Sequence, residues 1–461
     1  MSTQLTFTGC CEYPGLAYPK ETDLYCVASI QAPEYEADER KERAGIDLVC
    51  VIDKSGSMSG SKIELVKSTL AFMFDQLKPT DRVALVEFDS SVITTLAFTN
   101  MNEDGKQKAK QVANNIHAGT CTNLSGGLFE GLRLIKQRTA CNEVTSILLF
   151  TDGLANEGIT NTTEIVSKMN TTIHEEIRKQ ITCFTFGFGS DTDANMLTSI
   201  AQAGNGLYYF LNNVDDIPKA FGNVIGGLVS VVAQNIKVKI MPNSNVKLKK
   251  VFTTFRKTDL TGGTGCEIAV GDIYSEEKKD LVFVLTVPAL NGPVAMQELA
   301  KLQLQYFNVI NTDNEGFEFE IIVNRQSSQD PDKKTANYQL DIQRNRVESG
   351  EAMEQAKTLS DQGKLEEGRK LLTEAIAKIE ESVSGKDEFC VGLVKDLTDC
   401  KNNMVDRTTY SNVGSKMLNN YWSAQMCQRA TSCESSNTQA VYMNKKKAAM
   451  TSAFSSALKK K

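Results

Sequence analysis

The fold is decided by residues 46–60, which run Ile46-Asp-Leu-Val-Cys-Val-Ile-Asp53-Lys-Ser55-Gly-Ser57-Met-Ser-Gly60. The first seven residues are largely apolar and rich in β-branched side chains, which predicts a strand buried on both faces of a sheet. That strand ends at Asp53, and the Gly/Ser loop after it leads into a helical pattern from about residue 61 to residue 77. Ligands of open parallel sheets bind at the carboxyl ends of the strands, so this loop lies where a binding site is expected.

The loop supplies only oxygen ligands, because Asp53, Ser55 and Ser57 form the pattern Asp-x-Ser-x-Ser. One carboxylate and two hydroxyls suit a hard cation such as Mg²⁺, Ca²⁺ or Mn²⁺ and do not suit a soft metal. The same residues fit a simpler alternative, in which a serine caps the next helix and Asp53 accepts hydrogen bonds from loop amides. This pattern alone leaves both interpretations open.

Two later segments complete the pattern. Ser146-Ile-Leu-Leu-Phe-Thr-Asp152-Gly153 is a second buried-strand run that ends in Asp and Gly, and the polar loop at residues 118–127 contains Thr120, Thr122 and Asn123 before a helix. Together the three segments resemble the von Willebrand factor A (vWA) domain with its metal-ion-dependent adhesion site. The resemblance places the five metal ligands at Asp53, Ser55, Ser57, Thr122 and Asp152.

Thr122 is preferred to Thr120 as a ligand because the family's threonine precedes an asparagine, as Thr122 precedes Asn123. The spacing leaves Thr120 as a rival. Around the metal we expect a rim that contacts the partner, formed by Lys54, Met58, Thr120, Asn123, Gly153 and Asp191.

The resemblance also implies a mechanism of protein recognition. Two carboxylates nearly neutralise a divalent cation, and Mg²⁺ needs only one or two protein carboxylates because it keeps several waters. In the family, an Asp or Glu of the partner protein completes the metal shell. We therefore expect Mg²⁺, or alternatively Ca²⁺ or Mn²⁺, and a protein ligand with an exposed acidic side chain.

Composition restricts the other function classes. The 461 residues predict several domains, and the net charge of −6 argues against a general nucleic-acid binder. The start of the chain lacks the basic and apolar regions of a secretory signal, and no apolar run reaches the length of a membrane span. Twelve scattered cysteines without a CxxC pattern suit a reducing compartment, which predicts a cytoplasmic or alternatively nuclear protein.

The order of patterns predicts an α/β fold with further domains on either side. Residues 45–228 alternate strands and helices, which is typical of a doubly wound, mostly parallel sheet. Residues 229–340 contain short alternating runs divided by turns, which predicts an antiparallel β-sandwich. The two strand-like runs in residues 1–44 are expected to join this sandwich, on the far side of the vWA insert.

The C-terminal third is predicted to be helical and then irregular. Residues 341–405 show a helical hairpin and a further helix, which resembles a tetratricopeptide pair but lacks its repeat. Residues 406–461 are rich in polar side chains and end in lysines, so we expect a partly disordered tail. A hydrophobic patch at residues 417–426, around Trp422, is expected to dock on a domain or to recognise a partner.

The whole order resembles eukaryotic proteins in which a vWA domain precedes a vWA-interacting domain. The clearest matching stretch begins at Gly271-Asp-Ile-Tyr and runs to Val287-Pro288. Such proteins often carry a RING, U-box or Hint module, but this sequence has no Cys/His cluster for a RING and no other extra module. Ligase activity therefore does not follow from the resemblance.

Three classes of function remain. The favoured one is a metal-dependent protein-binding module or adaptor, and the second is a metal-independent scaffold for a multiprotein complex, such as one of the ubiquitin pathway. The third, a Mg²⁺-dependent phosphohydrolase with Asp53 as its nucleophile, is least favoured because position 55 is Ser where such enzymes place Asp. We therefore assign no catalytic residue and expect that the protein is not an enzyme.

Overall fold

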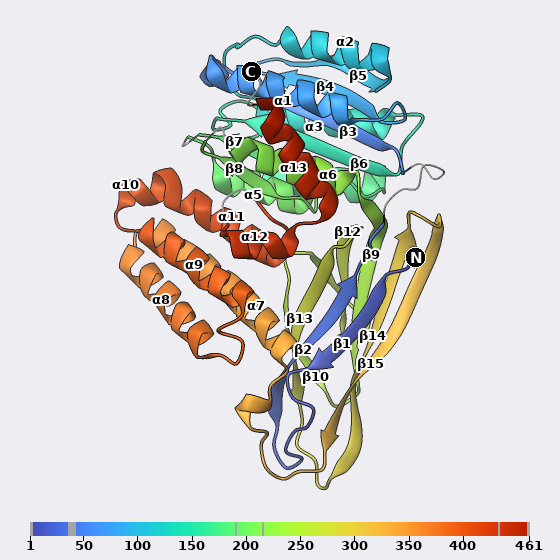
Figure 1. Ribbon diagram of the computed structural model, residues 1–461, viewed down its shortest axis with the longest axis vertical. Coiled ribbons are helices and arrows are strands. Elements are labelled where there is room, and N and C mark those ends of the chain that lie inside the picture. Colours follow the sequence, from blue (N-terminus) through green and yellow to red (C-terminus); the bar gives the residue numbers. More distant parts are fainter. Residues whose placement is uncertain (1–2, 36–42, 190, 214–215, 432–433, 459–461) are drawn as a thin grey trace.

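The computed structural model describes residues 3–35, 43–189, 191–213, 216–431 and 434–458 (Figure 1). An α/β unit lies at one end of the molecule, two antiparallel sheets lie at the other end, and a set of C-terminal helices lies beside both (Figure 1). This arrangement confirms the predicted fold class.

A six-stranded sheet with the order β5-β4-β3-β6-β7-β8 forms the centre of the α/β unit. Neighbouring strands are parallel except β5, which runs antiparallel to β4 at one edge. The strands are β3 (Ile46–Asp53), β4 (Arg82–Phe88), β5 (Val92–Asn100), β6 (Val144–Thr151), β7 (Thr182–Phe188) and β8 (Tyr208–Leu211). The helices are α1 (Ser61–Gln76), α2 (Glu103–Asn114), α3 (Leu124–Gln137), α4 (Thr162–Thr171), α5 (Ala194–Ala203) and α6 (Asp216–Leu228), with short turns η1 (Gly56–Met58) and η2 (Thr172–Ile177).

Helices cover both faces of this sheet, which explains why its central strands are largely apolar. In β3, Leu48, Cys50 and Ile52 belong to a core that includes side chains of α1, α2 and α6. The alternate residues Val49 and Val51 belong to a second core, with side chains of α3, α4 and α5. Successive side chains of a strand point to opposite faces, so in a strand between two helical layers the side chains on both faces are buried.

Two antiparallel sheets pack face to face below the α/β unit. One has the order β1-β2-β13-β10 and the other has the order β11-β12-β9-β14-β15. Their strands are β1 (Thr6–Cys11), β2 (Thr22–Gln31), β9 (Val231–Pro242), β10 (Lys247–Phe252), β11 (Arg256–Asp259), β12 (Cys266–Tyr274), β13 (Lys278–Val287), β14 (Val294–Asn308) and β15 (Asp313–Arg325). Strand β2 pairs with β13 over its whole length, so two strands from before the α/β unit share one sheet with two strands from after it.

The C-terminal helices begin earlier and continue further than the sequence pattern predicts. After the short turn η3 (Lys333–Thr335), they are α7 (Tyr338–Asp361), α8 (Leu365–Glu381), α9 (Glu388–Asn402), α10 (Arg407–Thr409), α11 (Ser415–Cys427), α12 (Ser436–Tyr442) and α13 (Lys445–Leu458), with the π-helical turn η4 (Tyr410–Gly414) before α11. The expectation of a partly disordered tail is therefore wrong for the described residues between 406 and 458. Residues 459–461 lie outside the described residues.

The last part of the segment after residue 405 forms helix α13, which packs along α6 of the α/β unit (Figure 1). This packing explains why a polar stretch of sequence is ordered. A Cβ atom on Gly226 would lie 2.6 Å from the Cα atom of Lys447, so the absence of a side chain lets the two helices approach closely. Lys447 is 2% exposed, and its ammonium group donates to the carbonyl of Tyr442 at 3.1 Å. The lysines at 445–447 thus belong to a packed helix, in which Lys447 is buried and Lys445 and Lys446 are exposed.

The predicted hydrophobic patch at residues 417–426 forms most of α11, which docks on the α/β unit. Asn420 accepts a hydrogen bond from the backbone of Phe210 in β8 at 3.3 Å. Asn419 donates to the side chain of Asn195 in α5 at 3.1 Å. Of the two roles expected for the patch, the structure thus shows docking on a domain.

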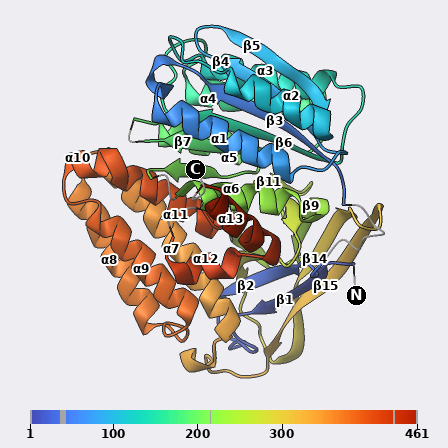
Figure 2. The ribbon, with the colours of Figure 1, turned by 45° about the horizontal axis from the view of Figure 1, so that its top comes forward.

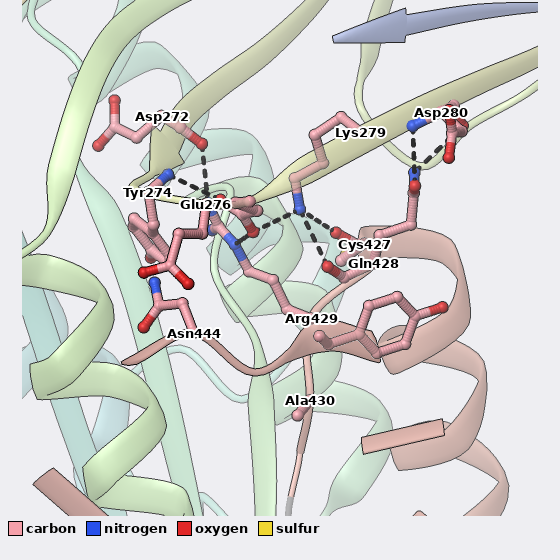
Figure 3. A network of polar contacts seen from close by, with 12 residues as sticks. Asp272, Tyr274, Glu276, Lys279, Asp280, Cys427, Gln428, Arg429, Ala430 and Asn444 are labelled. Atoms are coloured by element: carbon pink, nitrogen blue, oxygen red, sulfur yellow. Dashed lines mark hydrogen bonds and ion pairs between the residues drawn. The ribbon is translucent and has the colours of Figure 1, made fainter. Parts of the chain in front are cut away.

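A buried ionic network joins the C-terminal segment to the sandwich (Figure 3). Glu277 accepts hydrogen bonds from Arg429 at 2.8 and 3.2 Å and forms an ion pair with Lys279 at 2.8 Å. Arg429 also donates to the carbonyl of Asp272, and its guanidinium lies 4.0 Å from the ring of Tyr274. Burial raises the pKa of Glu277, but the positive charges of Arg429 and Lys279 outweigh burial and hold this pKa below its usual range.

In the part of the chain that the structure describes, every helix is too short or too polar to cross a lipid bilayer. The division into domains after residues 44, 228, 340 and 405 stays a prediction.

Candidate metal centre

The predicted ligands from the two strand ends lie where the strand order reverses. Strands β3 and β6 are neighbours, and the chain continues from β3 to β4 on one side and from β6 to β7 on the other (Figure 1). Asp53 is the last residue of β3, and Asp152 directly follows β6. The carboxyl ends of strands at such a reversal point are the usual binding sites of open α/β sheets.

Asp53 is fully buried and held by its neighbours. One of its carboxylate oxygens accepts from the Thr151 hydroxyl at 2.6 Å, and the other accepts from the backbone amide of Ser55 at 2.7 Å. Burial raises the pKa of Asp53 to about 6, although these hydrogen bonds act in the opposite direction. A nearby cation would favour the ionised carboxylate.

Ser55 and Ser57 connect the first strand end to the second. Their hydroxyl oxygens lie 3.1 Å apart, and the Ser57 hydroxyl donates to the carboxylate of Asp152 at 2.8 Å. Asp152 is 1% exposed, and Ser55 is equally buried. The structure therefore brings four of the predicted ligands into one hydrogen-bonded group.

Thr122 faces the same place from the third loop. A Cβ atom on Gly153 would lie 3.5 Å from the Thr122 hydroxyl oxygen and 3.6 Å from the Ser57 hydroxyl oxygen. Thr122 is 3% exposed, whereas the rival Thr120 is exposed and lies 2.7 Å from the Ser90 hydroxyl. This placement favours Thr122 over Thr120.

Backbone hydrogen bonds fix the loops against one another. The Gly56 amide donates to the carbonyl of Thr120 at 3.0 Å, and the Gly119 amide donates to the carbonyl of Lys54 at 2.5 Å. The Asn156 side chain accepts from the Thr122 amide at 2.9 Å. Because the loops are tied together by main-chain groups, the side chains that converge on the site are held in place before any ligand binds.

Lys62, in the first turn of α1, contacts this group and was not identified from the sequence. Its ammonium group forms an ion pair with the carboxylate of Asp152, and its side chain is 33% exposed. A lysine at that position in a helix is normally a solvated side chain, so the sequence carries no signal for this contact. The ammonium supplies positive charge beside two buried carboxylates.

The donor set is chemically suited to a hard cation. It contains two carboxylates, and its other oxygens are the hydroxyls of Ser55, Ser57 and Thr122. The described residues, those of this site included, contain no group of three or more His, Cys, Asp and Glu side chains that could hold a metal ion. Oxygen donors with few carboxylates fit Mg²⁺, which completes its octahedron with water.

The predicted rim residues have different surroundings. Met58 is fully buried in the core, so its place in the rim is wrong, because the turn η1 directs its side chain inward. Lys54 lies 3.4 Å from the carboxylate of Glu87, and Asn123 caps α3 by accepting from the Gly126 amide at 2.9 Å. Asp191 is exposed, and its charge acts on Lys416 of α11.

The family comparison matches residues 47–223 to the von Willebrand factor type A domain. This segment is a vWA domain. A solved von Willebrand factor type A protein from Catenulispora acidiphila covers 90% of this chain and 96% of its own, with a TM-score of 0.69 at 14% identity. The ArnB paralog VWA2 from Sulfolobus acidocaldarius covers 90% and 98%, with a TM-score of 0.57 at 16% identity. These likenesses show that the fold shared with the two solved structures includes parts of the chain outside the vWA domain.

Two sequence relatives match part of this chain. The E3 ubiquitin-protein ligase WAV3 of Arabidopsis thaliana is 30% identical over 253 residues, which is 54% of this chain and 32% of the ligase. The human inter-alpha-trypsin inhibitor heavy chain H1 is 26% identical over 200 residues, 41% of this chain and 22% of its own. The chain thus spans about a third or less of these relatives, which support a protein-interaction module.

A second family comparison concerns the C-terminal helices. Residues 336–447 match the N-terminal region of the CPSF6-like RSLD domain. The match begins just before α7 and ends within α13, so it includes the segment after residue 405 for which the sequence pattern predicted little order.

Proposed function

We propose that the vWA domain binds a divalent cation, Mg²⁺ or alternatively Ca²⁺ or Mn²⁺, and that the bound cation recognises an acidic side chain of a partner protein. Asp53, Ser55, Ser57, Thr122 and Asp152 hold the ion directly or through water. When bound, the ion supplies an electrophilic centre that an Asp or Glu of the partner can coordinate. Metal and partner then bind as one unit.

One observation carries this proposal most strongly. A hydrogen-bonded group runs from Asp53 at the end of β3 through Ser55 and Ser57 to Asp152 at the end of β6. A helix cap is the alternative interpretation of the Asp-x-Ser-x-Ser pattern, and it would not require hydrogen bonds that link the end of β3 to the end of β6. Moreover, α1 begins after Gly60 without a side-chain cap, so none of the loop serines caps this helix.

The residues of the proposed site have distinct tasks. Asp152 and the hydroxyls face the ion, whereas Thr151 and the Ser55 amide orient the carboxylate of Asp53. Lys54, Thr120, Asn123, Gly153 and Asp191 remain the proposed rim that contacts the partner. The same proposal places the protein in the cytoplasm or the nucleus and gives it the role of an adaptor without catalytic activity.

The proposal is tested by capture of partners in Mg²⁺ and in EDTA, with wild-type protein and the Asp53→Ala/Ser55→Ala variant, followed by mass spectrometry. Partners that are retained only by the wild type and only in Mg²⁺ support a metal-dependent adaptor. Partners that bind equally in all four conditions support a metal-independent scaffold instead. Release of phosphate from a generic aryl phosphate, lost in the variant, would support the phosphohydrolase.

A further inference from the structure

A second candidate site, with none of the proposed metal ligands in its lining, lies where the vWA domain meets the sandwich. A cleft of about 800 Å³ has one wall formed by α4, η2 and α5 and the other wall formed by β9, β11 and β12. Figure 2 shows β9 and β11 at the end of the sandwich that faces the vWA domain. The Gln180 side chain bridges the two walls by accepting from the amide of Asn235 at 3.2 Å. A volume of this size accommodates a small ligand.

Positive charge faces this cleft from both walls. Arg178 and Lys179 contribute from the vWA domain, and Arg256 and Lys237 contribute from the sandwich. No Asp or Glu among the described residues lines the cleft. Close to the cleft, Glu176 pairs with Lys136 at 3.1 Å, and Glu267 lies 3.7 Å from Lys237 and 3.8 Å from Lys239, so Glu267 partly compensates the charge of Lys237.

Arg178 and Arg256 are the important pair. Neither has a carboxylate within ion-pair distance among the described residues, and the Arg178 Nε atom donates only to the carbonyl of Glu175. Arg256 lies close enough to His174 on the opposite wall that its charge, after burial, lowers the pKa of His174. Like charges placed across a cleft repel each other, and an anion between them removes the repulsion.

The vWA wall has an unusual backbone at the same place. The turn η2 is a π-helix, a rare conformation that is frequent at functional sites. Arg178 ends it in the left-handed conformation with φ of 56°, and Asn235 on the facing wall has φ of 54°. Residues in this conformation cost free energy, persist where the surrounding structure holds them in place, and cluster at active sites and ligand-binding sites.

Two features of the wall specify the ligand further. No Phe, Tyr or Trp among the described residues lines the cleft, so no aromatic ring is available to stack on a nucleotide base. Neutral hydrogen-bonding side chains are frequent instead, among them Thr163, Asn170, Ser199 and Thr254. Guanidinium groups bind phosphate oxygens in pairs, and the neutral side chains suit hydroxyl groups.

We propose that this cleft binds a small polyhydroxylated molecule, a sugar or cyclitol, that carries two or more phosphate groups. Its phosphates contact Arg178 and Arg256, and it thereby bridges the vWA domain and the sandwich. The proposal does not depend on the metal site.

The test is calorimetric titration of the whole chain with myo-inositol hexakisphosphate in EDTA buffer at about 0.15 M salt, where nonspecific attraction is screened. We expect one ligand per chain and at least a tenfold loss of affinity in Arg178→Gln/Arg256→Gln. The matched control is Lys257→Gln, next to Arg256 on β11 but outside the cleft and paired with Asp259 at 3.4 Å. Thermal unfolding with and without ligand checks that each variant folds.

Several outcomes overturn the proposal. These are the absence of saturable binding, binding that survives the double variant, and equal weakening in Lys257→Gln. Tighter binding of ATP would show that a base is recognised, which contradicts a site without aromatic rings. Tighter binding of a hexaglutamate peptide would identify the cleft as a docking site for acidic protein segments.

Discussion

The ammonium group of Lys62 forms an ion pair with the carboxylate of Asp152, in the loop that follows β6. The same carboxylate accepts a hydrogen bond from Ser57 at 2.8 Å. A cation that binds this carboxylate must therefore compete with a charge that the chain itself supplies. The contact makes Lys62 a determinant of metal affinity, even though it offers no ligand atom.

Replacement of Lys62 by Met keeps most of the side chain but removes its charge. We expect Mg²⁺ to bind about two- to fivefold more tightly, because a partly exposed ion pair is worth about 0–1 kcal/mol. Calorimetric titration measures the change. Lys67→Met serves as control, because Lys67 lies on the same helix and pairs with Glu64 at 2.8 Å. Weaker binding in the Lys62 variant would show that the lysine assists the metal and does not compete with it.

Because Glu277 is the carboxylate of the buried network, we expect Glu277→Gln to lower the free energy of unfolding strongly. Removal of this charge leaves Arg429 and Lys279 buried without their carboxylate, and breaking a buried pair costs about 3–5 kcal/mol. Chemical denaturation of the variant measures the loss. Glu276→Gln is the matched control, since no ion pair of the neighbouring Glu276 side chain is found among the described residues, and it should change stability by less than about 0.5 kcal/mol. Equal effects of both changes would contradict the assigned role of the network.

Because β2 lies in the core of the sandwich, we expect replacement of a β2 isoleucine to lower the free energy of unfolding more than replacement of an exposed isoleucine in β15. Ile30 in β2 is fully buried between the sheets, whereas Ile322 in β15 is 37% exposed. Replacement of a buried isoleucine by alanine costs about 2–5 kcal/mol through lost contacts and a cavity. We expect Ile30→Ala to fall in that range and Ile322→Ala to cost less than about 1 kcal/mol. Similar losses in urea denaturation would show that β2 does not belong to the core.

Two buried acids in the helical region predict a pH dependence of stability. Burial raises the pKa of Asp396 to about 6 and the pKa of Glu434 to about 7. Asp396 accepts from the Ser435 amide at 2.8 Å and from the Thr438 hydroxyl at 2.9 Å, so it anchors the start of α12. In the unfolded chain both acids lose their protons at lower pH, so the folded state binds more protons and stability falls as pH rises through these values.

We expect the free energy of unfolding to decrease by roughly 1–3 kcal/mol between pH 5 and pH 8 from these two groups. The Glu434→Gln variant carries no titrating group at this position and should show a shallower decrease than the wild type. Thermal and urea unfolding across this pH range measure both slopes. A variant with the wild-type slope would exclude Glu434 as a contributor.

The sequence was sufficient for the α/β part because its signals are local. A largely apolar run such as β3 fits a strand between two helical layers, Asp53 ends that strand, and Asp152 directly follows β6. Predicted boundaries such as residues 61–77 for α1 (Ser61–Gln76) are therefore close to the observed ones.

The remaining features depend on contacts between distant residues. Helix α13 looks like a polar tail, and it is ordered because its small and polar residues meet Gly226 of α6. Met58 has the sequence position of a rim residue, but the turn η1 directs it into the core. The contact between Lys62 and Asp152 and the cationic cleft likewise form only when separate segments of the chain pack against each other.

The most direct test of the central claim is calorimetric titration of Mg²⁺ into the whole chain and into single variants of the proposed ligands. We predict one ion per chain in the wild type, loss of binding in Asp53→Asn, Ser55→Ala and Thr122→Ala, and retained binding in Thr120→Ala. The absence of saturable binding in the wild type, or unchanged affinity in Asp53→Asn, would contradict the account.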